Sequence, residues 1–136
     1  MVRENLINYI GLRHDYDSIN CITIIDRFFK TELDIDDIEK LIPSDIVNRR
    51  WMKKFSLEQI DEWALQYGIK VPLTEAQDFD VMVFKSRIFT RPVHFGMFIK
   101  PCHMLHLEEG RTSRYEPITN EWLGALYAIY RHKSLV

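Results

Sequence analysis

Hydrophobic and polar positions divide the chain into a helical first half and a strand-rich second half. Residues 20–33 read NCITIIDRFFKTEL, in which apolar side chains recur at helical spacing. This pattern predicts an amphipathic helix with Asn20 as its N-cap. The apolar stripe consists of Cys21, Ile24, Ile25, Phe28 and Phe29, and the opposite side of Asp26, Arg27 and Lys30.

A second helical region follows, with two or more short helices between about residues 34 and 70. One of them is predicted to start at Ser56, where Gln59 completes a capping box, and to close at Gly68. The region also carries a basic run, NRRWMKK, and several large aromatics. Such aromatics usually cover a core, but aromatics beside arginines also typify protein interfaces. Both interpretations stay open for Arg49, Arg50, Trp51, Phe55, Trp63 and Tyr67.

From Ile69 onward the period changes from helical to strand-like. Short runs at residues 80–89, 93–99 and 102–109 are rich in Val, Ile, Phe and Met, and Pro, Gly and charged turns bound them. Helices followed by strands predict an α+β fold, with N-terminal helices packed on a small antiparallel sheet.

Residues 91–110 contain three of the five histidines and are expected to form a hairpin that turns at Lys100. A midpoint there places His94 opposite His106, with Cβ atoms about 5 Å apart, close enough for the imidazoles to hydrogen-bond. Gly96 then leaves room on that face for a ligand or for another element. The residues expected to share the face form the pairs His94–His106, Gly96–Met104 and Phe98–Cys102.

Composition narrows the class of protein. A chain of 136 residues, 46% of them hydrophobic, suffices for one domain, spanning 1–136, and is too short for two ordinary ones. A net charge of -2 without a basic footprint gives no support for nucleic acid as a partner. Neither a secretory signal nor an apolar run of about 18 residues is evident, so we expect synthesis in a cytoplasm and no membrane insertion. In that reducing compartment Cys21 and Cys102 are expected to stay unpaired.

The histidines also have simpler explanations. A histidine in an apolar strand is more often a core residue with one hydrogen bond than a catalyst. His103 and His132 are expected to be solvated. A zinc site could draw on His94, Cys102, His103 and His106, but an extended strand sends His103 to the face opposite Cys102 and His106. We therefore expect no metal and no other cofactor.

A cysteine at a helix start, followed by histidines on two successive strands, resembles the NlpC-type family of cell-wall cysteine peptidases. The matching segments are YIGLRHDYDSINC, VHFGMFI and HMLHLEEG, with EWLGALYAIYRH near the end of the chain. The resemblance implies a papain-like fold, Cys21 as nucleophile, His94 as general base and His106 as the residue that orients it. It also implies an oxyanion-stabilising donor from His14 or Tyr16.

The places of these residues also predict their chemistry. A cysteine in the first turn of a helix lies at the positive end of the helix dipole, and a nearby imidazolium would add to the effect. The pKa of the Cys21 thiol is therefore expected to be lowered. His94 would accept the thiol proton, and His106 would hold the ring of His94 in the useful tautomer.

Departures from the cellular pattern favour the phage tail-tip branch of the family. Asn20 stands for the usual Asp, and Ile22 and Thr23 stand for Ser-Gly. The residues at about 34–70 look like an inserted helical region. The implied function is a phage tail-associated peptidoglycan hydrolase that cleaves an amide bond of stem peptides, is made in the bacterial host cytoplasm and is incorporated in the virion tail. The alternative is a non-catalytic structural or assembly subunit of a tail tip, which retains the fold and contacts other phage tail proteins.

Overall fold

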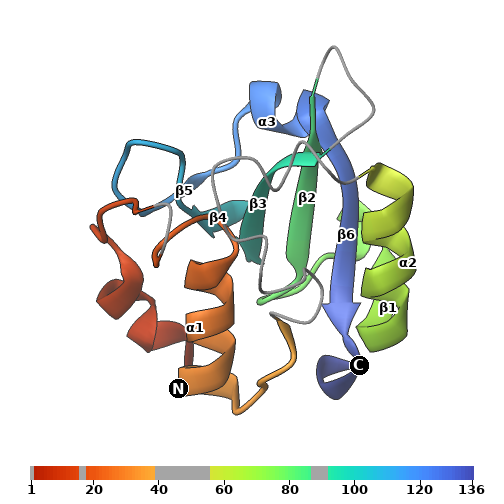
Figure 1. Cartoon of the computed structure of the whole chain (residues 1–136), viewed down its shortest axis with the longest axis horizontal. Helices are drawn as coiled ribbons and strands as arrows, with labels where there is room; N and C mark the ends of the chain where they lie inside the picture. Colours follow the sequence, from red (N-terminus) through yellow and green to blue (C-terminus); the bar gives the residue numbers. More distant parts are fainter. Residues whose placement is uncertain (1, 16–17, 39–55, 87–91) are drawn as a thin grey trace.

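A computed structural model describes residues 2–15, 18–38, 56–86 and 92–136 (Figure 1). The helices in this part of the chain are η1 (Val2–Tyr9), α1 (Thr23–Leu33), α2 (Leu57–Tyr67), η5 (Leu73–Glu75), α3 (Asn120–Ala125) and η6 (Lys133–Leu135). The strands are β1 (Gly68–Val71), β2 (Val81–Lys85), β3 (Pro92–Ile99), β4 (His103–His106), β5 (Arg114–Pro117) and β6 (Leu126–His132). Within the described residues, no helix is both long and apolar enough to cross a membrane.

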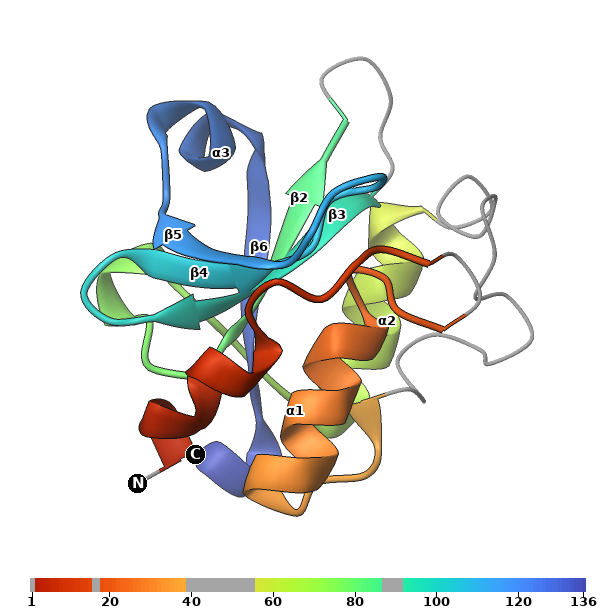
Figure 2. The same cartoon turned by 90° about the vertical axis from the view of Figure 1, so that its left-hand side faces the viewer.

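The described strands form one six-stranded antiparallel sheet in the order β1-β6-β2-β3-β4-β5. The helices α1 and α2 pack on one face, and α3 lies over the other face. Figures 1 and 2 both show α3 well apart from α1. The predicted α+β architecture is therefore confirmed, with β6, from the end of the chain, inserted between β1 and β2.

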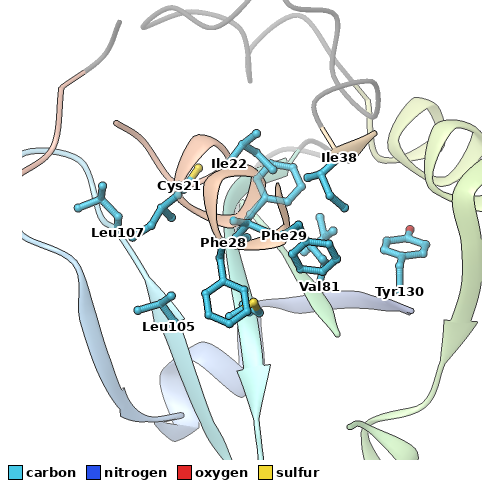
Figure 3. Close-up of a cluster of buried hydrophobic side chains, with 14 of the residues drawn as sticks. Cys21, Ile22, Phe28, Phe29, Ile38, Val81, Leu105, Leu107 and Tyr130 are labelled. Atoms are coloured by element: carbon cyan, nitrogen blue, oxygen red, sulfur yellow. The ribbon is translucent and has the colours of Figure 1, made fainter. Parts of the chain in front are cut away.

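Two apolar clusters hold the layers together. The α1-face core packs α1, α2 and η1 against one side of the sheet (Figure 3). Its most deeply buried members are Ile24, Ile25, Phe28, Phe29, Val83, Met97, Ile99, Leu105 and Leu107. The α3-face core is smaller and consists of Val71, Ala76, Met82, Phe84, Phe98, Met104, Ile118 and Ile129, with Trp122 among the partly buried residues packed against it.

Asn20 caps the turn that leads into α1, but the N-cap of the regular helix is Ile22, which makes no side-chain capping bond. Asn20 Oδ1 accepts hydrogen bonds from the backbone N–H groups of Ile22 and Thr23, each at 3.0 Å. The regular helix then begins at Thr23, so Cys21 lies in the turn before it. Asp26, expected on the polar side, is instead buried, and it forms an ion pair with Lys30 at 3.0 Å. A buried carboxylate with a lysine one turn away is tolerated because the cation offsets the loss of hydration.

The capping box of α2 is also confirmed. Ser56 Oγ accepts from the Gln59 N–H at 3.1 Å, and Gln59 Oε1 accepts from the Ser56 N–H at 2.9 Å. The helix also closes at Gly68 as predicted, and this C-cap residue is extended and opens β1. A Cβ there would lie 2.0 Å from the carbonyl oxygen of Arg131. Glycine at this position therefore permits the close approach of β1 to β6.

The structure tests part of the predicted partner surface. Trp63 packs against the α1-face core, and the half-buried Tyr67 ring has Lys133 Nζ 5.8 Å from its centroid. These two aromatics therefore contact the rest of the fold. Arg49, Arg50, Trp51 and Phe55 lie outside the described residues, as does the whole basic run at residues 48–54.

The β3–β4 hairpin forms, but its register differs from the predicted one. His106 lies opposite Gly96, and Met104 lies opposite Phe98. The predicted pairs of His94 with His106 and of Phe98 with Cys102 are wrong because Cys102 belongs to the turn, which shifts the midpoint to Pro101. The shift along β3 is two residues, and side chains alternate with a period of two, so both histidines keep the same face.

Candidate functional site

The two predicted histidines meet through a hydrogen bond. His94 Nε2 lies 2.9 Å from His106 Nδ1, and both side chains are buried. They are diagonal neighbours across β3 and β4, which brings the ring edges within reach of each other. The space beside Gly96 is already occupied, since a Cβ at Gly96 would lie 3.1 Å from Met104 Sδ and 3.5 Å from the Phe84 ring. The expected open gap is therefore filled by core side chains.

A carboxylate that the sequence analysis did not single out completes this arrangement. Glu116 Oε1 lies 2.7 Å from His106 Nε2. Glu116 belongs to the edge strand β5, where it lies opposite Met104. Its side chain keeps 30% of its surface exposed, whereas that of His106 keeps 1%. A chain of two hydrogen bonds thus runs from buried His94 to the partly hydrated Glu116.

Aromatic rings enclose His94 on the α3 face. The ring of Trp122 stacks on His94 at 4.9 Å between centroids and meets His106 edge-on at 5.5 Å. Phe84 lies 5.8 Å from His94. Thr119 Oγ1 accepts a hydrogen bond from the backbone N–H of Trp122 at 3.3 Å. This bond caps the short helix α3, which carries the Trp122 side chain. Burial, reinforced by His106, lowers the pKa of His94 to about 3, so its imidazole is neutral at neutral pH.

Cys21 contacts the same strand from the other side of the sheet. Figure 3 shows it at the start of α1, among the side chains of the α1-face core. The thiol is 5% exposed and interacts with the backbone N–H of Phe95, the residue directly after His94. No hydrogen bond joins Cys21 to the His94 ring within the described residues. The cysteine and the histidine therefore approach one peptide unit of β3 from opposite faces.

Burial decides the protonation of Cys21. It raises the pKa of the thiol to about 12, and the backbone N–H groups of Phe95, Cys21 and Ile22 oppose it only in part. The expected lowered pKa is thus wrong for this state, because the dipole at a helix start does not compensate for removing a thiolate from water. The resting site therefore holds a neutral thiol and a neutral imidazole.

The residues expected to assist the oxyanion are described only in part. The N–H of the half-buried His14 donates to the carbonyl of Arg111 at 3.0 Å, which fixes this segment beside the turn between β4 and β5. Tyr16 lies outside the described residues. The backbone N–H of Cys21 could also donate to an oxyanion, because it has no hydrogen-bond acceptor other than its own sulfur in the part of the chain that the structure describes.

Of the two histidines expected to be solvated, His132 is buried and His103 is half-buried. His132 is 7% exposed, lies 2.6 Å from Asp37 through Nε2, and accepts from the Ser134 N–H at Nδ1. His103 is half-buried and stacks on Tyr115 at 5.2 Å, and its Nδ1 is buried without a hydrogen-bond partner among the described residues. Both were misjudged because their cover comes from segments distant in sequence.

The structure brings together a set of potential metal ligands that differs from the one considered in the sequence analysis. Among the described residues, His106, Glu108 and Glu116 alone place ligand atoms of three such side chains within 4.8 Å of one another. Three ligands fall short of a closed zinc site, and His106 already bonds to Glu116.

Cys21 and Cys102 are both free thiols, as predicted.

Comparison with known proteins identifies the fold. No family model and no curated protein matches the sequence. A solved structure described as similar to a lipoprotein of the NLP/P60 family, from Staphylococcus aureus subsp. aureus Mu50, superposes with a TM-score of 0.62 at 14% identity. An NlpC/P60 family protein from Bacillus cereus ATCC 10987 gives 0.65 at 18%, and the NlpC/p60 domain of the peptidoglycan hydrolase SagA gives 0.61 at 12%.

These matches cover nearly the whole chain but differ in how much of the other protein they use. The matches span 96%, 95% and 96% of this chain, and 40%, 39% and 95% of the three solved chains respectively. At such low identity the likeness establishes the papain-like α+β fold of NlpC/P60 proteins, and the chain spans about two-fifths of the length of the first two neighbours.

Proposed function

We propose that this protein is a cysteine peptidase that hydrolyses an amide bond of peptidoglycan stem peptides. The observation that carries the proposal is the bond between His94 and His106, next to the peptide unit that the Cys21 thiol contacts. The fold shared with NlpC/P60 proteins supports the substrate class, since one of these neighbours is a peptidoglycan hydrolase.

In the proposed reaction His94 acts as the general base. It accepts the proton of Cys21 while Sγ bonds to the carbonyl carbon of the substrate amide. The C–N bond then breaks, and the amine leaves with the proton held by His94. A water molecule, deprotonated by His94, hydrolyses the thioester and restores the thiol. The N–H of Cys21, with a donor from His14 or Tyr16, stabilises the oxyanion.

The pKa values support base-assisted attack in preference to a preformed ion pair. The pKa of Cys21 is raised to about 12 and that of His94 is lowered to about 3, so no thiolate accumulates in the resting state. Transfer of the proton therefore accompanies attack on a bound carbonyl. In this structure the Cys21 thiol is buried and makes no hydrogen bond to the His94 ring, so substrate binding must bring the thiol to both His94 and the substrate carbonyl.

The burial of the Cys21 thiol also supports a second candidate function, a non-catalytic assembly subunit of a phage tail tip that keeps the fold. In such a subunit the thiol would stay buried, and Trp122 would stay stacked on His94. The phage setting of both candidates rests on the residues around the cysteine, Asn20, Ile22 and Thr23. Mass spectrometry of purified virions would find the chain in tails if that setting is correct.

Incubation with purified peptidoglycan fragments, followed by mass analysis, tests the enzymatic proposal. The expected result is a new amine terminus within the stem peptide for the wild-type protein and none for Cys21→Ala. The matched control is Cys102→Ala, since Cys102 is a free thiol in the hairpin turn and has no proposed role. Fragments left intact by the wild-type protein would favour the assembly subunit.

A further inference from the structure

In the chain of hydrogen bonds His94–His106–Glu116, the carboxylate at one end decides which atom donates in each bond. A carboxylate only accepts hydrogen bonds, so the 2.7 Å contact requires the proton on His106 Nε2. When His106 is itself neutral, it carries only this one N–H, and its Nδ1 is an acceptor. In that state the 2.9 Å contact requires the proton of neutral His94 on its Nε2, whereas a cationic His106 would donate at both nitrogens. The remaining ring nitrogen, His94 Nδ1, is left with its lone pair.

We infer that Glu116 is a positioning residue that sets the tautomers of both histidines, an inference that rests on the proposed peptidase function. Through His106, its carboxylate makes Nδ1 of His94 the basic nitrogen, which is the form that a general base needs. The reverse chain, with a proton on His94 Nδ1, has no lone pair to offer to a thiol. Glu116 touches neither the nucleophile nor the base, and it acts only through His106.

A neighbouring glutamate allows the hydrogen-bonding role of Glu116 to be distinguished from the effect of its negative charge. Glu108 is also half-buried and has a carboxylate oxygen within 4.8 Å of the same ligand atoms, yet only Glu116 hydrogen-bonds to His106. A general electrostatic effect on the histidines would be shared by both glutamates. A tautomer effect belongs to Glu116 alone, and Glu108→Gln is therefore a matched control.

Two variants of Glu116 make the test specific. Glu116→Gln keeps the size of the side chain, but the amide can donate as well as accept, so the direction of the chain is lost. Glu116→Asp keeps the acceptor on a shorter side chain. We expect kcat/KM on peptidoglycan fragments to fall about 10- to 100-fold for Glu116→Gln, mainly in kcat, with partial recovery in Glu116→Asp. Glu108→Gln should stay within about twofold of wild type.

A spectroscopic readout of the free protein tests the tautomers without any substrate. Nitrogen-15 chemical shifts distinguish protonated from unprotonated ring nitrogens, and the wild type should show N–H at Nε2 of both His94 and His106. Glu116→Gln should convert part of the population to Nδ1–H, and Glu108→Gln should not. A wild-type spectrum with Nδ1–H on His106 would overturn the inference.

The two readouts also separate this inference from the proposed function. If no fragment is cleaved while the tautomers follow Glu116 as expected, the peptidase proposal fails and the tautomer assignment stands. If the wild type cleaves fragments while Glu116→Gln and Glu108→Gln give equal rates and unchanged tautomers, the peptidase proposal stands and the role of Glu116 is rejected.

Discussion

The two faces of the sheet differ in what they bury. The α1 face buries a continuous apolar cluster under two helices, and the candidate nucleophile Cys21 is a buried member of that cluster. The α3 face buries a smaller apolar cluster together with two imidazoles, under a helix of six residues. Most of the hydrophobic stabilisation therefore comes from the α1 face, because it scales with the apolar area removed from water.

Strand β3 contributes side chains to both faces of the sheet, which brings His94 and Cys21 to the same strand. Phe95 and Met97 of β3 point into the α1-face core, whereas His94 and Phe98 point to the α3 face. The strand is thus fixed from one side while the polar chain occupies the other. The faces meet at the peptide between His94 and Phe95, where the thiol interacts. The following predictions test this division, from the largest expected effect to the smallest.

Removing a ring from the α1-face core should have the largest effect on stability. Phe28 is fully buried, and its ring centroid lies 5.0 Å from that of Tyr9 and 5.3 Å from that of Phe79. Phe28→Ala should reduce the free energy of unfolding by about 3–5 kcal/mol, measured by urea denaturation. If the α1 face is the stabilising one, the loss should exceed that of Met104→Ala. An equal or smaller loss would remove the asymmetry between the faces.

Removing the indole from the α3 face should cost less stability but change the site more. Trp122 is only half-buried, so Trp122→Ala should cost about 1–3 kcal/mol. Since burial is the main cause of the lowered pKa of His94, exposing the ring should raise that pKa toward 6.5. Titration followed by NMR measures it. A His94 pKa that stays near 3 in Trp122→Ala would mean that other groups bury the ring.

Hydrophobic spacing and local capping predicted much of the fold. Asn20, Ser56 and Gln59 act within three residues of their partners, so their hydrogen bonds depend on local sequence. The common face of His94 and His106 follows from strand periodicity, which survives a register error of two residues. The α+β class could be predicted for the same reason.

Features that depend on distant segments could not be predicted. His132 is buried through a bond to Asp37, 95 residues earlier in the chain. Glu116 contacts His106 from an edge strand of four residues, RYEP. This strand has no alternation of hydrophobic and polar residues from which it could be predicted. A lowered pKa of Cys21 was predicted from the helix start and a nearby imidazolium, whereas burial raises it. Tertiary contacts and desolvation account for each of these failures.

The buried imidazole of the α3 face should make stability depend on pH. The folded pKa of His94, about 3, lies below the unfolded value of 6.5, so between these values the unfolded chain binds a proton that the folded protein excludes. Stability should therefore fall as pH decreases from about 6.5 to about 3, by up to about 1.4 kcal/mol per pH unit from this group. Urea denaturation of wild type and His94→Gln over this range should show a shallower slope for the variant. Parallel wild-type and His94→Gln curves would show that the pKa of His94 is not lowered in the folded state.

The smallest predicted effect lies where α1 begins, at the edge between the faces. Asn20→Ala removes the acceptor for the N–H groups of Ile22 and Thr23 and should cost about 1 kcal/mol. Because Cys21 lies in the capped turn, fraying there should expose the thiol, and its alkylation by iodoacetamide should become several-fold faster. Asn20→Asp is the matched control, since a carboxylate caps a helix as well as an amide does, and it should restore both stability and slow alkylation. Alkylation of Cys21 at the wild-type rate in a destabilised Asn20→Ala protein would show that packing against Phe95, and not the cap, keeps the thiol enclosed.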